Sequence, residues 1–312
     1  MQRSKFLSGV AAATIAFPLD ARAQSAPIKL GAVGVEDYAL GYYAQERGFF
    51  KRAGFNVELN LFGGGGAAST ALYAGALDLS GTNTGSMSSA HVRGLPVALL
   101  AGGSEYNTAT PHVYLVTTKD SPIRGAKDLA GKTIAVTSLG DLMQAAVMSW
   151  IDKGGGNSSQ TTFLELNTAQ MAPSLLAHRI DATVLVEPFY TESKNDVRVL
   201  GTPFDAVAKQ FMITGWVAND KWLAANKAAA EQFAGVMRTA AHWANTNPKD
   251  AQTLLAAYTK LDPAVIAATN HVRWVEKLDP ALIQPVIDVI VQYKMLPHTY
   301  SAAELFAGAI KT

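Results

Sequence analysis

Short apolar stretches alternate along most of this chain with stretches in which apolar residues recur at helical spacing. The first series predicts strands over residues 28–33, 55–61, 76–79 and 96–102, with helices between them, one over residues 42–53 ending at Gly54. A second series predicts strands over residues 112–118, 133–137, 162–166, 182–186 and 197–200. This repeated alternation of strand and helix is typical of layered α/β domains.

A further strand is predicted over residues 211–217, and helical patterning follows to the end of the chain. Two α/β units joined near residues 97–118, with a return near residues 200–217, imply two lobes with a double crossover. Lobe one is expected to comprise residues 27–110 and 214–312, and lobe two residues 111–213, inserted within it. We expect a mixed sheet flanked by helices in each lobe.

Four consecutive glycines stand between a predicted strand and a predicted helix, within Leu61–Ala68. Glycine lets the backbone come close to a ligand, and the first N–H groups of a helix carry a partial positive charge. A strand, a glycine loop and a helix start form a common ligand-binding unit of α/β proteins. A flexible connector is the alternative interpretation. The segment lacks the Gly-Lys-Ser/Thr of a phosphate loop and the spacing of a dinucleotide fingerprint.

The first 23 residues have the pattern of a cleaved secretory signal. Arg3 and Lys5 precede an apolar run over residues 6–19, and Ala21-Arg22-Ala23 forms a small-x-small cleavage site. The run is interrupted by Ser8, Gly9 and Pro18, so a membrane anchor is the weaker alternative. The signal predicts export, and we expect a periplasmic location.

Charge and composition exclude several classes of function. The formal net charge is +1, which gives no broad attraction for nucleic acid or anionic lipid. The chain has no cysteine, which excludes disulfides, thiolate catalysis and thiolate metal sites. Its six histidines are scattered without metal-ligand spacing, and there is no Gly-x-Ser-x-Gly nucleophile motif. We therefore expect no cofactor, no metal and no enzymatic activity.

Several motifs resemble the periplasmic solute-binding proteins of ABC transporters, in the group that binds nitrate, sulfonates, taurine and thiamine-pyrimidine precursors. The similar segments are the tetraglycine and YYAQERGFFKRAGF (residues 42–55), LYAGALDLSGTNTG (72–85), DLAGKTIAV (128–136) and LLAHRIDATVLVEPF (175–189). They span essentially the whole chain after the signal. The resemblance implies two lobes that close on a ligand and then deliver it to an ABC permease in the inner membrane. We expect a monomeric receptor.

Loops that follow the predicted strands should line the cleft between such lobes. They contain five acids and no lysine, arginine or histidine: Glu36, Asp37, Glu105, Asp141 and Glu187. Glu36, Asp37 and Asp141 could equally be helix N-caps or first-turn acids. Glu187 is the strongest candidate, since Glu187-Pro188 resembles the cleft-facing Glu-Pro of the family.

The remaining candidate ligand contacts are aromatic, hydroxyl, amide and glycine residues in the same loops. They are Tyr38, Gly64, Gly65, Asn83, Thr84, Tyr106, Ser138, Leu139 and Trp216. For the aromatic residues the alternative is core packing, and for Asn83, Thr84 and Ser138 it is helix capping.

Acid-rich loops disfavour a bare anion, because like charges repel. The sequence therefore favours a nitrogen-containing or heteroaromatic solute with N–H or cationic groups. An organic anion, such as a sulfonate, taurine or an aromatic carboxylate, is the alternative ligand, held by helix starts and backbone N–H groups. A ligand-sensing adaptor is the alternative to an importer subunit, and the sequence does not separate the two.

Overall fold

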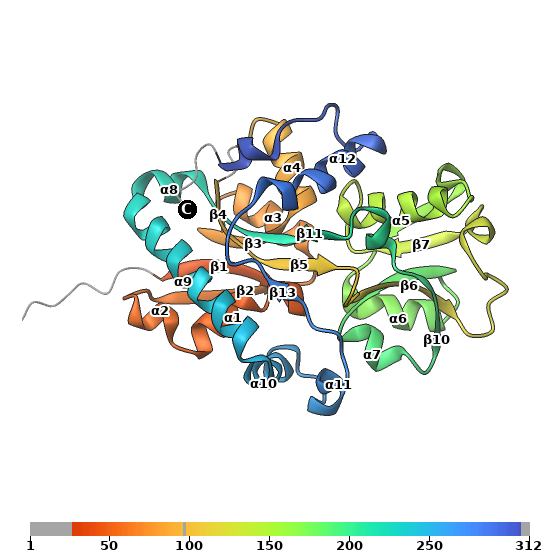
Figure 1. The fold of residues 1–312 in the computed structure, drawn as a ribbon, viewed down its shortest axis with the longest axis horizontal. Helices are drawn as coiled ribbons and strands as arrows, with labels where there is room; N and C mark the ends of the chain where they lie inside the picture. Colours follow the sequence, from red (N-terminus) through yellow and green to blue (C-terminus); the bar gives the residue numbers. More distant parts are fainter. Residues whose placement is uncertain (1–26, 96–97, 307–312) are drawn as a thin grey trace, which may run out of the picture.

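The computed structural model describes residues 27–95 and 98–306, so the predicted signal peptide at residues 1–23 lies outside the described residues. Two large mixed sheets stand side by side along the longest axis of the molecule, and a smaller sheet lies between them (Figure 1). Helices cover the faces of both large sheets. The predicted class, α/β with two mixed sheets flanked by helices, is confirmed.

The first large sheet has the order β2-β1-β3-β12-β4. Its strands are β1 (Ile28–Val33), β2 (Val57–Phe62), β3 (Leu79–Asn83), β4 (Ala98–Gly102) and β12 (Thr214–Ala218). Strand β1 pairs in parallel with β2 and β3, whereas β12 runs antiparallel between β3 and β4. The connecting helices are α1 (Leu40–Glu46), α2 (Phe49–Arg52), α3 (Gly65–Tyr73) and α4 (Thr84–Val92).

The second large sheet has the order β10-β6-β9-β7-β8. Its strands are β6 (Val113–Thr118), β7 (Thr133–Val136), β8 (Thr162–Glu165), β9 (Ala182–Val186) and β10 (Val197–Gly201). Strand β7 pairs in parallel with β8 and β9, and β6 is antiparallel to β9 and β10. Its helices are α5 (Leu142–Lys153), α6 (Thr168–Leu176) and α7 (Phe189–Ser193). The buried side of α6 packs Met171 and Leu175 against the sheet.

A three-stranded antiparallel sheet lies where the chain passes between the two large sheets (Figure 1). It consists of β5 (Ser104–Asn107), β11 (Gln210–Met212) and β13 (Arg273–Trp274). A single residue, Ile213, separates β11 from β12 of the first large sheet. The Ile213 N–H donates to the Ser104 carbonyl at 2.9 Å, and the Ile213 carbonyl accepts from the Thr84 N–H at 2.9 Å.

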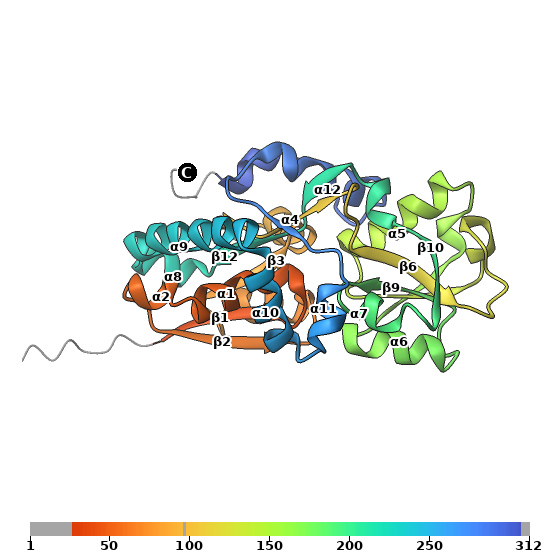
Figure 2. The same ribbon diagram turned by 60° about the horizontal axis from the view of Figure 1, so that its bottom comes forward.

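The C-terminal part of the chain is mainly helical, as predicted. It contains α8 (Asp220–Ala225), α9 (Lys227–Thr246), α10 (Pro248–Thr259), α11 (Pro263–Ala267) and α12 (Gln284–Gln292). Helix α9 packs against α1, α2 and β4, whereas α12 packs against both α4 and α5. Helix α11 contacts α7 (Figure 2). The C-terminal helices therefore touch elements of both large sheets.

Three local predictions were wrong. The third strand is Leu79–Asn83 rather than residues 76–79, so Ser80, Gly81 and Thr82 belong to a buried strand. The strand predicted over 211–217 is two strands of different sheets, divided at Ile213. The helix predicted over 42–53 is interrupted at Gly48, which has a φ of 67°. In addition, the short strands β5 and β13 were not predicted.

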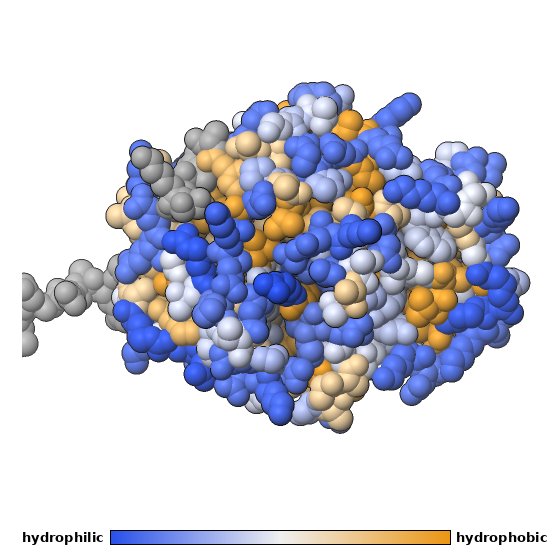
Figure 3. Space-filling view, viewed as in Figure 1, coloured by the Kyte–Doolittle hydropathy of each residue, from blue (hydrophilic) through white to orange (hydrophobic). Residues whose placement is uncertain are grey.

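On the face of the molecule shown in Figure 3, hydrophilic residues predominate and apolar residues gather in separate patches. Among the described residues, none of the helices has the length and apolar character needed to span a bilayer.

Candidate functional site

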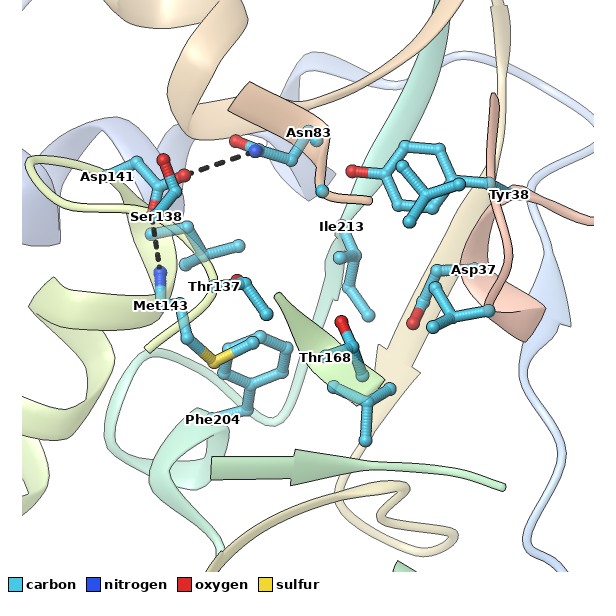
Figure 4. A pocket seen from close by; sticks show the side chains of 16 residues that line it. Asp37, Tyr38, Asn83, Thr137, Ser138, Asp141, Met143, Thr168, Phe204 and Ile213 are labelled. Carbon is cyan, nitrogen blue, oxygen red and sulfur yellow. Dashed lines mark hydrogen bonds between the residues drawn. The ribbon is translucent and has the colours of Figure 1, made fainter. Parts of the chain in front are cut away.

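A small cavity of about 60 Å³ lies between the two large sheets (Figure 4). On the side of the first sheet, its wall consists of the ends of β1 and β3 and the glycine loop after β2. On the side of the second sheet, it consists of the loop after β7, the end of β9 and the start of α6. Strand ends of both sheets thus face one another, which is where open α/β sheets bind ligands. The cavity is lined by Val33, Val35, Asp37, Tyr38, Gly64, Gly65, Asn83, Thr137, Ser138, Asp141, Leu142, Met143, Thr168, Val186, Phe204 and Ile213.

Asn83 and Asp141 join the two sides of the cavity (Figure 4). Asn83 caps α4 by accepting from the Ser86 N–H at 2.7 Å, and its Nδ2 donates to Asp141 Oδ2 at 3.1 Å. Asp141 in turn caps α5 by accepting from the Met143 N–H at 3.1 Å. Burial raises the pKa of the Asp141 carboxyl to about 7, although hydrogen bonds from Met143, Ser138 and Asn83 lower it. Both residues therefore cap helices and also line the cavity.

The glycine loop packs closely against the side chains around the cavity. A Cβ on Gly65 would lie 2.5 Å from the Tyr38 hydroxyl oxygen, and a Cβ on Gly63 would lie 2.9 Å from Asn167 Oδ1 on the opposite side. A side chain at either position would push these neighbours away, so the glycines permit the close approach of the two halves. Burial, followed by the charges of Asp37 and Asp141, raises the pKa of Tyr38 far above its ordinary value. The Tyr38 hydroxyl therefore remains protonated and able to donate a hydrogen bond.

Two histidines accompany the predicted acids Glu36 and Asp37. Nε2 of His112 lies 3.4 Å from Asp37 Oδ1, within the distance of an ion pair but without the alignment of a hydrogen bond. Nδ1 of His271 lies 2.9 Å from Glu36 Oε1. Burial lowers the pKa of both histidines, but the neighbouring carboxylates outweigh it and raise both pKa values overall. Two of the predicted acids therefore have histidine partners that come from outside the cleft-lining loops.

Glu36 does not line the cavity between the sheets. It lines a separate, wider groove of about 490 Å³ beside β13 and α9, together with His271 and the pair His242–Glu276. We take the smaller cavity as the candidate site, because it collects strand ends from both sheets. The groove beside β13 receives residues of the C-terminal part and Glu36 only.

Glu187, the favoured candidate, is 2 % exposed and caps the start of α7. One carboxylate oxygen accepts from the Thr191 N–H at 3.0 Å and the other from the Thr191 hydroxyl at 2.9 Å. Its neighbour Val186 lines the cavity, but Glu187 does not. Burial, opposed by the bonds from Thr191, raises the pKa of Glu187. The structure therefore gives Glu187 a capping role.

Two predicted aromatic contacts belong to packed clusters instead of the cavity wall. Trp216 is 1 % exposed and packs edge-on against Phe233 in the core of the first sheet. Tyr106, on β5, packs against Phe204 and Phe211, and its hydroxyl donates to Asp205 Oδ1 at 2.8 Å. Trp216 and Tyr106 therefore pack in the core, which was the alternative interpretation of the aromatic residues.

Three other candidates also lie away from the cavity lining. The Thr84 hydroxyl donates to the Ile213 carbonyl at 3.2 Å and is buried at the start of α4. Leu139 is 47 % exposed, and its N–H donates to Glu165 Oε2 at 3.1 Å. Glu105 accepts from Gln210 Nε2 at 2.7 Å across the β5–β11 pair.

The cavity brings together seven of the predicted contacts, namely Asp37, Tyr38, Gly64, Gly65, Asn83, Ser138 and Asp141. Sequence reasoning missed Val33, Met143, Phe204 and two threonines. Thr137 immediately precedes Ser138 and Thr168 follows β8, so both had the same strand-end signal. Phe204 had no such signal, because it lies in the connection between β10 and β11.

The sequence matches a known protein family, and the fold matches known structures. The model of the family "NMT1/THI5 like" matches residues 36–251, which is more than half of the chain. The chain belongs to the NMT1/THI5-like family. No curated protein sequence is a significant match.

Solved structures similar to this NMT1/THI5-like protein include solute-binding proteins. The alkanesulfonate-binding protein SsuA from Xanthomonas axonopodis pv. citri, bound to MOPS, has a TM-score of 0.75 and 19% identity, covering 92% of this chain and 98% of its own. The periplasmic nitrate-binding protein NrtA from Synechocystis PCC 6803 has a TM-score of 0.74 and 16% identity, covering 91% of this chain and 86% of its own.

A ligand-binding component of an ABC-type import system from Staphylococcus aureus, with zinc bound, has a TM-score of 0.76 and 14% identity. It covers 91% of this chain and 96% of its own. Within residues 27–95 and 98–306 of the present chain, no group of three His, Asp or Glu side chains is placed to hold a metal ion. The predicted resemblance is confirmed, since the chain matches the NMT1/THI5-like family model and shares the fold of these solute-binding proteins.

Proposed function

We propose that this protein is the periplasmic receptor of an ABC importer and that it captures a small nitrogen-containing or heteroaromatic solute. The observation that carries the ligand class is the composition of the cavity wall. It contains the carboxylates of Asp37 and Asp141 and neither lysine nor arginine. Carboxylate oxygens accept hydrogen bonds from N–H groups, which a bare anion such as nitrate does not offer. The Tyr38 hydroxyl adds a donor, and Phe204 and Met143 add apolar surface for a ring.

Capture would occur by closure. Small-molecule sites usually occupy at least about 300 Å³, so a ligand enters this cavity only when the two sheets separate. The proposed lobes are residues 27–110 with 214–312, and residues 111–213. The proposed hinge is the small sheet of β5, β11 and β13, through which the chain passes from one lobe to the other. The closed receptor would then dock on its permease and release the solute.

An organic anion is the second candidate ligand, and a different observation favours it. The starts of α3, α4 and α5 all reach the cavity, through Gly65, Asn83 and Leu142. Free N–H groups and the helix dipole at such ends attract negative charge. The names of SsuA and NrtA describe anion receptors of this fold.

Thermal-shift screening of the purified protein tests the two ligand classes directly. We expect aminopyrimidines and aromatic amides to raise the melting temperature and alkylsulfonates and aromatic carboxylates to leave it unchanged. The Asp37→Asn variant should weaken binding of a hit by about tenfold or more, because a charge-assisted hydrogen bond is lost. Asp196→Asn, at an exposed position outside the cavity, is the matched control and should bind as the wild type does. Shifts produced by sulfonates alone would reject the proposed ligand class.

A further inference from the structure

His112 stands directly behind the acidic wall of the cavity. It precedes β6, its carbonyl accepts from the Glu187 N–H at 2.9 Å, and it is 1 % exposed. Its Nε2 lies 3.4 Å from Asp37 Oδ1, while the same Asp37 lines the cavity. His112 is not itself part of the cavity wall. Its ring can therefore influence a ligand through Asp37 and not by contact.

The charges around the ring favour its protonated form. The carboxylates of Asp37, Glu36 and Glu187 face it, and the uncharged Tyr106 ring packs 5.8 Å away, centroid to centroid. Glu36 already has a partner in His271, at 2.9 Å, so Asp37 is the carboxylate with which His112 interacts most directly. Burial lowers the pKa of His112, but these carboxylates raise it overall. In a dry environment, opposite charges at this distance attract strongly.

We propose that His112 is a specificity-determining residue whose ring offsets the charge of Asp37, so that the cavity selects neutral hydrogen-bonding ligands over organic cations. This inference rests on the proposed function and narrows its ligand class. When Asp37 is paired with the His112 ring, it can still accept a hydrogen bond from a ligand. Its negative charge, however, is no longer available to balance a cationic ligand. Asp141, the other carboxylate, is engaged by Asn83 and the Met143 N–H.

The protonation of His112 can be measured without a ligand. Ring NMR signals of isotopically labelled histidine are followed against pH, and the His112→Gln variant identifies the His112 signal. In the wild type we expect a midpoint above the ordinary value of about 6.5. In Asp37→Asn we expect the midpoint of the His112 titration to fall by about one unit or more. Burial lowers the pKa of His112, and the Asp37 carboxylate would no longer outweigh it. Glu276→Gln, which removes the carboxylate 3.0 Å from exposed His242, is the matched control and should leave His112 unchanged.

The second readout compares benzamide with the benzamidinium ion, which has almost the same shape and carries a charge. We expect the wild type to prefer benzamide, and His112→Gln to shift the ratio of dissociation constants toward benzamidinium by about tenfold or more. Adding Asp37→Asn to His112→Gln should cancel that shift.

A His112 midpoint below 6.5, or one that is unaltered by Asp37→Asn, would overturn the inference. A preference of the wild type for benzamidinium would do the same. If neither compound stabilises any variant, the proposed ligand class fails, while the ring titration still decides the role of His112. The two proposals can thus fail separately.

Discussion

The Asp141 carboxyl is 4 % exposed at the start of α5 and makes the contact with Asn83 across the cavity. Its pKa is about 7 in the folded protein, against an ordinary value of 3.8. The folded state therefore binds more protons than the unfolded chain between these two values. This contribution to stability is fully present below about pH 3.8 and is lost as the pH rises through about 7.

We predict that the free energy of unfolding falls as the pH rises from about 4 to 7, with Asp141 contributing on the order of 4 kcal/mol at most. Urea unfolding at several pH values measures this slope. The Asp141→Asn variant should show a flatter slope. Its absolute stability is not informative, because its amide would place a donor opposite the Asn83 donor. An unchanged slope in the variant would show that Asp141 titrates normally.

Trp216 is expected to matter for stability and not for ligand contact. Its ring fills the space above two glycines, so that a Cβ on Gly41 would lie 2.8 Å from it and a Cβ on Gly81 3.4 Å. We predict that Trp216→Ala lowers the free energy of unfolding by about 3–5 kcal/mol, because a large cavity remains. Leu61→Ala, at a position that is 54 % exposed, should change it by less than about 0.5 kcal/mol. Denaturant titration measures both.

Predicting individual site residues from the sequence worked for part of the chain near the ends of strands. Asp37, Asn83, Ser138 and Asp141 were found in this way and line the cavity, whereas Glu187, directly after β9, does not. His112 and His271 were missed because the first precedes a strand and the second follows a short helix far along the chain. Their proximity to Asp37 and Glu36 depends on the packing of distant segments, which leaves no local signal.

Helices α4 and α5 meet at their first turns, and Gly85 makes this contact possible. A Cβ on Gly85 would lie 2.7 Å from the Leu142 backbone nitrogen and 3.0 Å from Ile290 Cδ1. Because a backbone atom cannot move alone, an added methyl group must push the two helices apart. Those helix starts carry Asn83 and Asp141, so the spacing of the cavity walls depends on this position.

We predict that Gly85→Ala weakens ligand binding by about tenfold and lowers the free energy of unfolding by about 1–3 kcal/mol. Calorimetric titration with a thermal-shift hit measures the first effect. Gly235→Ala in α9 is the matched control, since its Cβ would meet only Arg238 Nη2 at 3.9 Å. It should leave binding unchanged and raise stability by up to about 1 kcal/mol. Equal effects of both variants would mean that the α4–α5 contact has no special role.

Most helices and strands followed the hydrophobic pattern, and the exceptions have physical causes. Strand β3 reads as a polar loop because Ser80, Gly81 and Thr82 are small or hydroxylated, yet it lies buried between β1 and β12. Gly81 lies against the rings of Tyr38 and Trp216, which occupy the space that a side chain at position 81 would fill. The apolar run at residues 211–217 gave no sign of changing sheets, since both halves are equally buried.

Closure of the two proposed lobes can be tested with an introduced disulfide, because the natural chain has no cysteine. A Cβ on Gly63, in the first proposed lobe, would lie 3.1 Å from Asn167 Cγ, in the second, so cysteines at these positions are close enough to bond. We predict that Gly63→Cys combined with Asn167→Cys forms a disulfide on oxidation. The oxidised protein should no longer respond to added ligand, and reduction should restore the response.

Each single cysteine variant is the control and should bind ligand under both conditions. Electrophoresis without reductant measures the cross-link, and thermal shift measures the response. Failure to form the bond would contradict the close approach of Gly63 and Asn167. A cross-linked protein that still binds at the normal rate would argue against entry by separation of the lobes.

Ile213 lines the cavity and is also the single residue that connects β11 to β12. Its backbone is tied to Ser104 on one side and to Thr84 on the other. In the proposed receptor, a bulkier or smaller side chain there would alter both the fit of the solute and the movement of the proposed lobes. A substitution of Ile213 that admits a new solute should therefore also change the rates at which the proposed lobes open and close.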